Sequence, residues 1–289
     1  MRNIISLNDG WLFVKNTLDI NADGGAQINL PHTWNAEDGY DGGNDYFRGS
    51  CLYKKTLKKS DLPESDLYYL EFRGANSSAD VYVNGKKLAH HDGGYSTWRV
   101  NITDELDADA EISVIVDNAP NDRVYPQMAD FTFYGGLYRG VNLVCVNNTH
   151  FDLDYFGAPG IKITPAVNGG DASVEVEVYT TNLKDGQTIR YTLYDKDGNE
   201  ISKIESSETK VSFDIKNVHL WNGRKDPYLY SCKAEIVENG DALDAVSSRF
   251  GCRTYEIDPN RGFILNGEVL SFPCFILFAN PSQYLTPSL

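Results

Sequence analysis

The sequence predicts an all-β protein in which short strands form two successive sandwiches, and three observations support this fold class. Apolar residues alternate with polar ones in short runs, as half-buried strands require. Gly, Asn and Asp separate these runs at intervals of about ten residues, which is typical of β-sandwiches. No stretch carries apolar residues at helical spacing over the three turns of an ordinary amphipathic helix.

The strands of the first half follow from this period of two. Residues 79–83 place Ala, Val and Val on one face and Asp and Tyr on the other, and the Asn-Gly pair at 84–85 predicts a tight hairpin turn. Residues 112–116 repeat the pattern with Ile, Val and Val. The apolar run Leu-Val-Cys-Val at 143–146 is typical of a strand covered on both faces.

A domain boundary is predicted between residues 147 and 160, where Asn-Asn-Thr and Ala-Pro-Gly interrupt the strand pattern. Beyond it, residues 174–179 alternate Val with Glu or Tyr, which indicates one buried and one solvated face. We therefore divide the chain into residues 1–150, residues 158–257 and a terminal segment at 258–289.

Composition excludes several classes of function. The chain has 41 acidic and 26 basic residues and a formal charge of −15, which argues against a nucleic-acid partner because phosphate binding needs clustered Lys and Arg. Its five cysteines are dispersed with no Cys-x-x-Cys pair, so they are expected to be reduced, small apolar residues rather than metal ligands.

The location of the protein is predicted from its termini and its apolar runs. The first residues lack an apolar signal-peptide core, which favours a cytoplasmic protein, or a periplasmic one if a signal peptide has been removed. The apolar run at 272–279 is too short to cross a bilayer, so no membrane partner is expected.

A series of motifs then carries a family resemblance. They are Leu-Asn-Asp-Gly-Trp at 7–11, Leu-Pro-His-Thr-Trp-Asn at 30–35, Asp-Val-Tyr-Val-Asn-Gly at 80–85, Phe-Tyr-Gly-Gly-Leu-Tyr-Arg at 133–139, Leu-Trp at 220–221, Pro-Tyr-Leu-Tyr at 227–230 and the stretch from Arg249 to Glu268. In this order they resemble glycoside hydrolase family 2, the β-galactosidases and β-glucuronidases. The resemblance covers residues from about 7 to 270.

The resemblance implies an N-terminal jelly-roll (galactose-binding-like) sandwich followed by an immunoglobulin-like sandwich. It also implies a whole enzyme that is a retaining glycosidase similar to β-galactosidase, hydrolysing terminal β-D-galactosides. Its two catalytic glutamates would lie on a (β/α)8 barrel of about 250 residues, which begins where residues 258–270 end the match. We expect this chain to be the non-catalytic N-terminal portion, inactive alone.

Residues 271–289 contain no Asp, Glu, Lys or Arg, and we interpret them as a tail foreign to the family, out of frame or rearranged. Two alternatives remain open for the function of the chain. It could be a free-standing, lectin-like carbohydrate-binding module, or it could assemble with a barrel from another chain. The expected partners are thus a β-galactoside or related carbohydrate, and the catalytic barrel of the same or another chain.

The site residues are predicted by position in the family pattern. An Asp shortly before the Gly-Gly motif binds the sugar in related β-galactosidases, with a sodium ion in some, and its counterpart here is Asp130. Asn44 and Asp45 lie in the polar, Gly-rich loop 41–48, which is expected to line the same pocket. No catalytic residue and no other cofactor are predicted. Equally open is that Asp130 is an ordinary surface-turn residue.

Other polar clusters give weaker candidates. Glu175 and Glu177 share a solvent-facing strand edge, and His90 and His91 are adjacent on a strand, so their side chains point to opposite faces and do not suit one metal ion. The tryptophans are expected in structural positions, with Trp221 filling the second sandwich. Trp11, Trp34 and Trp98 are likewise expected in a core or an interface rather than stacked on a sugar.

Overall fold

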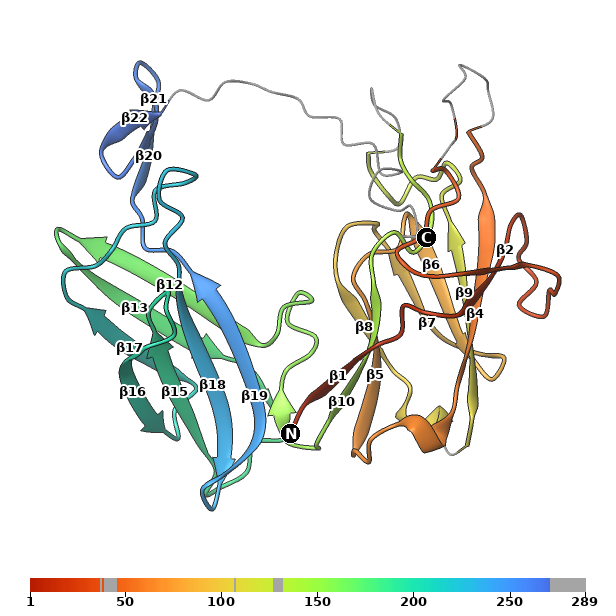
Figure 1. Cartoon of the computed structure of the whole chain (residues 1–289), viewed down its shortest axis with the longest axis horizontal. Coiled ribbons are helices and arrows are strands. Elements are labelled where there is room, and N and C mark those ends of the chain that lie inside the picture. The colour runs from red at the N-terminus through yellow and green to blue at the C-terminus, as the bar shows by residue number, and fades with distance from the viewer. Residues whose placement is uncertain (37, 39–45, 107, 127–131, 271–289) are drawn as a thin grey trace. The chain divides into compact units, whose positions relative to one another are not determined.

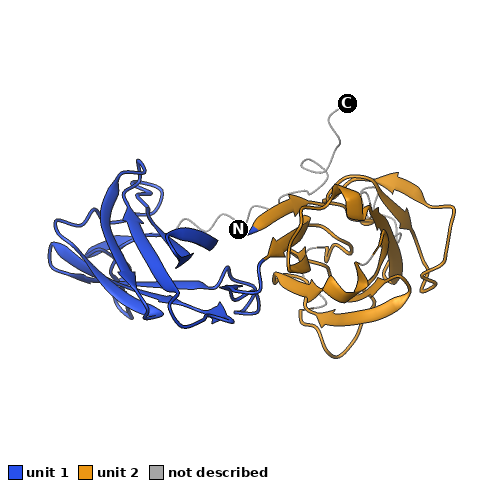
Figure 2. Ribbon diagram, turned by 90° about the horizontal axis from the view of Figure 1, so that it is seen from below, with its two compact units in different colours: residues 1–2, 147–276 blue, residues 3–146, 277–289 orange. Residues whose placement is uncertain are grey.

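The computed structural model describes residues 1–36, 38, 46–106, 108–126 and 132–270, and within these ranges the all-β prediction is confirmed (Figure 1). The helical residues described form two single turns, η1 (Lys59–Asp61) and η2 (Thr103–Glu105). Neither is long enough to cross a membrane, and no described helix is. Two compact units are distinguished in Figure 2. We call residues 3–146 the N-terminal sandwich, and residues 1–2 with 147–270 the C-terminal sandwich.

The N-terminal sandwich packs two antiparallel sheets around one core. The four-stranded sheet has the order β1 (Asn3–Ser6), β10 (Val141–Val146), β5 (Leu67–Phe72) and β8 (Trp98–Asn101). The six-stranded sheet has the order β3 (Ala26–Ile28), β2 (Trp11–Val14), β4 (Ser50–Leu57), β9 (Ala110–Asp117), β6 (Ser78–Val83) and β7 (Lys86–Asp92). Side chains from the inner faces of both sheets form a single apolar cluster.

The strand predictions for this sandwich are confirmed. Ala79, Val81 and Val83 on β6 are at most 1% exposed and belong to the core. The β6–β7 hairpin turns through Asn84 and Gly85, which have φ of 51° and 80°, the left-handed conformation that an Asn-Gly turn supplies. On β10 the four residues from 143 to 146 are all buried, so this strand is covered on both faces.

The C-terminal sandwich has seven strands in two facing sheets of three and four, an immunoglobulin-like arrangement. The smaller sheet has the order β12 (Ile161–Asn168), β13 (Asp171–Val178) and β17 (Lys210–Ile215). The larger has β16 (Glu200–Ser206), β15 (Thr188–Tyr194), β18 (Tyr230–Glu238) and β19 (Asp241–Phe250). Two small sheets complete the unit: β11 (His150–Phe151) with β14 (Thr180–Thr181), and β20 (Tyr255–Asp258), β21 (Gly262–Leu265) and β22 (Glu268–Leu270).

The alternation on β13 is also confirmed. Val174, Val176 and Val178 are at most 3% exposed, whereas Glu175 and Glu177 face solvent. The two carboxylates form ion pairs with lysines on neighbouring strands, at 2.9 and 3.6 Å. They are therefore part of a solvated strand face, as expected, and not a catalytic pair.

A buried ion pair ties residue 2 into the C-terminal sandwich. Asp244 on β19 is fully buried, and its two carboxylate oxygens accept hydrogen bonds from Arg2 Nη2 at 2.9 Å and Nε at 3.2 Å. The backbone N–H of Phe151 donates to the same carboxylate at 2.8 Å, and Arg2 donates to the Phe151 carbonyl oxygen, also at 2.8 Å. Arg2 thus balances a carboxylate that has no access to water.

The prediction for Trp221 is wrong. Its ring does not belong to the buried core of the C-terminal sandwich but lines a surface pocket, with the Arg253 guanidinium 4.9 Å from the ring centre. The alternation that identifies strands says nothing about this loop, so the sequence offered no burial signal here. The other three tryptophans, Trp11, Trp34 and Trp98, belong to the core of the N-terminal sandwich, as expected.

The cysteines are buried thiols in the described part of the chain. Cys51, Cys145, Cys232 and Cys252 are unpaired and at most 1% exposed, which confirms their expected role as small apolar residues. Burial raises the pKa of the Cys51, Cys145 and Cys252 thiols to about 11 and that of Cys232 to about 12. All four are therefore protonated and unreactive at neutral pH.

Candidate functional site

The three residues predicted to bind sugar, Asp130, Asn44 and Asp45, lie outside the described residues, as do the remaining residues of 39–45 and 127–131. The structure does describe the residues on either side of these two segments. These flanking residues show which described parts of the chain meet next to the two segments.

The side chain of Asn35 connects these flanking residues through hydrogen bonds. It is only 1% exposed, and its side-chain amide donates to the carbonyl oxygen of Phe47 at 2.8 Å and to the Asp38 carboxylate. Its side-chain oxygen accepts hydrogen bonds from the Gly135 backbone N–H at 2.8 Å and from the Asn118 amide at 3.2 Å. One buried side chain thus joins segments that lie 12 and 100 residues away along the sequence.

Three further hydrogen bonds connect residues of the same junction. The Tyr46 hydroxyl, directly after segment 39–45, donates to the carbonyl oxygen of Phe133, shortly after segment 127–131, at 2.6 Å. Arg48 Nε donates to the carbonyl oxygen of Asn118 at 2.8 Å, and the Gly49 N–H donates to the Asn118 side chain at 2.9 Å. Described residues that follow the two predicted sugar-binding segments, Tyr46 and Phe133, are therefore bound directly to each other.

The Gly-Gly pair of the 133–139 motif is required by the closeness of this packing. A Cβ on Gly135 would lie 2.2 Å from Trp34 Cζ2, and a Cβ on Gly136 would lie 2.6 Å from the Tyr53 hydroxyl. Gly136 also has φ of 117°, a conformation that residues with a side chain rarely adopt. The motif thus passes directly over the 30–35 segment, and no larger residue fits at either position.

Burial keeps two aromatic side chains beneath this junction, His32 and Tyr53, uncharged. His32 Nδ1 lies 2.8 Å from the Tyr53 hydroxyl, and desolvation lowers the pKa of His32 to about 4. Desolvation likewise raises the pKa of Tyr53 well above its usual value. At neutral pH both rings are neutral. The ionised groups described at the junction are the Asp38 carboxylate and the Arg48 guanidinium.

The junction is suited to binding rather than to bond cleavage. Its described residues include one carboxylate, Asp38, which is held by Asn35 and by the Phe47 N–H, whereas a retaining glycosidase uses two carboxylates about 5–5.5 Å apart. No group of three or more His, Cys, Asp or Glu residues in the described ranges is arranged to hold a metal ion. The sodium ion expected near Asp130 remains a prediction.

Sequence reasoning did not identify Asn35 or Tyr46 as the residues that join the two segments. Asn35 was visible as the last residue of the 30–35 motif, but nothing in that motif indicates a partner 100 residues away. Tyr46 lay within the polar loop 41–48 that was expected to line a pocket. An unusually buried Asn is a property of the folded chain, and only the structure shows it.

Comparisons with known proteins agree with this architecture. Residues 44–131 match the model of the glycosyl hydrolase 2 galactose-binding domain-like family, and residues 158–253 match the model of glycosyl hydrolases family 2. The first range falls in the N-terminal sandwich, and the second falls in the seven-stranded C-terminal sandwich.

Curated relatives and solved structures resemble the chain over most of its length. A β-glucuronidase of Bacteroides fragilis is 33% identical over 93% of this chain, and a putative β-glucuronidase of Formosa agariphila is 35% identical over 91%. The crystal structure of an FMN-binding β-glucuronidase from Facaelibacterium prausnitzii L2-6 matches 93% of the chain with a TM-score of 0.85 and 40% identity. The chain spans 40%, 33% and 42% of these three proteins, respectively. The chain belongs to glycosyl hydrolases family 2, and it corresponds to the N-terminal portion of its relatives.

Proposed function

We propose that this chain supplies part of the sugar-binding wall of a retaining β-glycosidase and does not itself carry the catalytic pair. In this proposal the two catalytic glutamates belong to a (β/α)8 barrel, contributed by the same protein or by another chain. The family membership supports this separation of sugar binding from catalysis. The chain also matches only 33–40% of the length of the two curated relatives.

The observation that carries the proposal is the junction at Asn35. The Tyr46 hydroxyl bonds the Phe133 carbonyl, so the described residues that follow segments 39–45 and 127–131 lie side by side. This supports the proposal that one ligand contacts both segments. Asp130, Asn44 and Asp45 would then provide carboxylate and amide groups for sugar hydroxyls, and a sodium ion bound through Asp130 would add a cationic contact.

The C-terminal sandwich offers a surface on which the barrel can pack. An apolar pocket of about 940 Å³ lies between the Trp221 loop and the β20–β22 sheet, and Phe263, Leu265 and Leu270 line it. Nearby, Ile257 is 77% exposed. Large exposed apolar side chains are typical of surfaces that another protein part covers. Since the relatives extend well beyond the matched region, the barrel is the occupant that we propose.

The sugar at the cleaved end is either galactose or glucuronic acid. The motifs of the sequence favoured terminal β-D-galactosides, and a Thermoanaerobacter pseudethanolicus β-galactosidase, 25% identical over 93% of this chain, supports that choice. The two relatives with higher identity quoted above are named β-glucuronidases, which favours β-D-glucuronides. We therefore propose β-D-glucuronides as the first substrate class to test and β-D-galactosides as the second.

Two chimaeras test the proposal. In each, residues 1–270 replace the matching front of a relative, the Bacteroides fragilis β-glucuronidase or the Thermoanaerobacter β-galactosidase. We expect the chain alone to release no p-nitrophenol from either p-nitrophenyl β-D-glycoside. We also expect the glucuronidase chimaera to keep a larger fraction of its parent's kcat/KM than the galactosidase chimaera. Turnover by the purified chain, or two folded but inactive chimaeras, would refute the proposal.

A further inference from the structure

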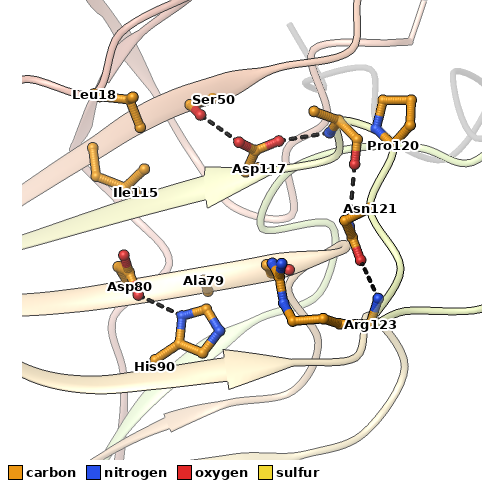
Figure 3. A pocket seen from close by; sticks show the side chains of 12 residues that line it. Leu18, Ser50, Ala79, Asp80, His90, Ile115, Asp117, Pro120, Asn121 and Arg123 are labelled. Carbon is orange, nitrogen blue, oxygen red and sulfur yellow. Dashed lines mark hydrogen bonds and ion pairs between the residues drawn. The ribbon is translucent and has the colours of Figure 1, made fainter.

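A second pocket lies on the outer face of the N-terminal sandwich. It has a volume of about 300 Å³, at the lower end of the range of small-ligand sites. Figure 3 shows its lining, which includes the end of β9, the neighbouring strands β6 and β7, and the segment that follows β9. Nothing proposed above uses this pocket.

Strand register explains why polar side chains gather there. Asp80 on β6 pairs with His90 on β7 and with Ile115 on β9, so these three side chains form one row across the sheet. In the next row, Asp117 pairs with Ser50 on one side and Ser78 on the other. Because Ala79 and Val116 of the same strands point into the core, both rows point away from it.

The polar groups are held in fixed positions by their neighbours. His90 Nδ1 lies 2.6 Å from Asp80, its Nε2 lies 3.2 Å from Asp92, and Arg123 Nε lies 2.9 Å from the same Asp92 oxygen. Across the pocket, the Ser50 hydroxyl and the Ala119 backbone N–H donate to Asp117 at 2.5 and 2.6 Å. These contacts fix the carboxylates before any ligand arrives, which lowers the entropic cost of binding.

The same groups remain accessible to a ligand. The side chains of Asp80 and Asp92 are 27% exposed, that of His90 is 44% exposed and that of Arg123 is 52% exposed. The hydrogen bond to Asp80 raises the pKa of His90 despite its partial desolvation. Carboxylate acceptors and cationic donors therefore face the pocket together.

The charges select for a neutral ligand. An anion would meet the carboxylates of Asp80 and Asp117, whereas a cation would meet His90 and Arg123. A neutral molecule with several hydroxyl groups can donate to the carboxylates and accept from the cations at once. The pocket also has an apolar side, since Leu18 is 73% exposed beside Pro120 and Ile115, and C–H groups can pack on it.

We propose that this pocket is a secondary binding site for one neutral hexopyranose unit, with Asp80 and Arg123 as its main polar contacts. A pyranose ring has hydroxyl groups that donate and accept along its edge and C–H groups on its faces, which is the combination that the lining offers. The described residues hold no cluster suited to a metal ion, so a cation is not the occupant that we expect. The site goes beyond the function proposed above.

Ligand-observed NMR on the full chain tests this site. We expect methyl β-D-galactopyranoside or methyl β-D-glucopyranoside to bind with a millimolar Kd. We expect methyl β-D-glucuronide to bind at least tenfold more weakly, because its carboxylate meets those of Asp80 and Asp117. Asp80→Asn and Arg123→Ala should each weaken the neutral glycoside about tenfold or more, the effect of losing one charge-assisted hydrogen bond.

Two control variants distinguish this site from the Asn35 junction and from general effects. Asp171→Asn removes an equally ion-paired but remote carboxylate, whose partner Lys216 lies 2.8 Å away, and it should leave the Kd unchanged. Asp130→Ala removes only a contribution from the junction, so the binding that Asp80→Asn and Arg123→Ala weaken should persist in this variant. Melting temperatures check that each variant is folded.

Three outcomes would overturn the inference. The first is the absence of glycoside binding to the folded wild-type chain at millimolar concentration. The second is binding that Asp80→Asn and Arg123→Ala leave unchanged. The third is binding that only Asp130→Ala removes, which would assign the sugar to the junction and leave this pocket a purely structural ion-pair network.

Discussion

Replacing Arg2 by alanine tests how the C-terminal sandwich is stabilised. The substitution leaves Asp244, which is fully buried, without its cationic partner. Removing one member of a buried pair typically costs about 3–5 kcal/mol. The Phe151 and Ala245 backbone N–H groups still donate to the Asp244 carboxylate, at 2.8 and 2.9 Å, so we expect the lower end of that range, about 3 kcal/mol.

Differential scanning calorimetry of the full chain provides the assay. For a unit of this size, a loss of about 3 kcal/mol corresponds to a decrease of about 10 °C in the melting temperature of the C-terminal sandwich. The matched control is Lys216→Ala, which removes an exposed ion pair to Asp171 with a similar separation of 2.8 Å and should lower the melting temperature much less, because solvent screens this pair.

A second variant isolates the uncompensated charge as the cause. Adding Asp244→Asn to Arg2→Ala removes the buried negative charge, so the double variant should be more stable than Arg2→Ala alone. If Arg2→Ala melts within a degree of Lys216→Ala, the buried pair does not stabilise this sandwich and the reasoning is wrong.

Three further predictions concern the N-terminal sandwich and the buried thiols. Gly135→Ala places a methyl group 2.2 Å from Trp34, and urea unfolding should show a loss of about 1–3 kcal/mol; unchanged stability would contradict the packing. His32 has its pKa lowered to about 4, so the neutral form is favoured in the folded state. The contribution of His32 to the free energy of unfolding is therefore complete above pH 6.5 and declines as the pH falls toward 4, by at most about 3 kcal/mol. Urea titrations at several pH values measure this decline, and His32→Gln should reduce it. Cys232, with a pKa of about 12, and the other buried thiols should react with a thiol reagent only after denaturant is added; fast labelling of the described cysteines in the native chain would contradict their burial.

The fold was predictable wherever one face of a strand is buried. The alternation at 79–83 and 174–179 follows from the period of two in a strand, and the Asn-Gly turn at 84–85 follows from its need for positive φ. The order of the family motifs along the chain was also sufficient to assign them to the two sandwiches. The sequence could not show which loops meet, because loop contacts join positions that are remote in sequence and have no periodic signal.

The candidate sites, like the loop contacts, have no periodic signal in the sequence. Asn35 joins two loops through hydrogen bonds to residues 12 and 100 positions away, and no local pattern predicts such a pairing. The outer pocket was equally invisible, since Asp80 and His90 are merely the polar members of two alternating strands. Register brings them together with Asp117, and an ion pair to Asp92 places Arg123 beside them; both are properties of the folded sheet. Trp221 was misplaced for a related reason, because aromatic character alone does not decide burial.

The most direct test of the central claim is the kinetics of Asp130→Ala in the chimaera that retains activity. The account predicts that the variant raises KM at least tenfold for the p-nitrophenyl glycoside, because this chain contributes to sugar binding while the barrel carries out the reaction. Asp171→Asn in the same chimaera is the control and should leave KM unchanged. If Asp130→Ala has the same KM and kcat as this control, the chain does not supply the sugar-binding wall, and the account is contradicted.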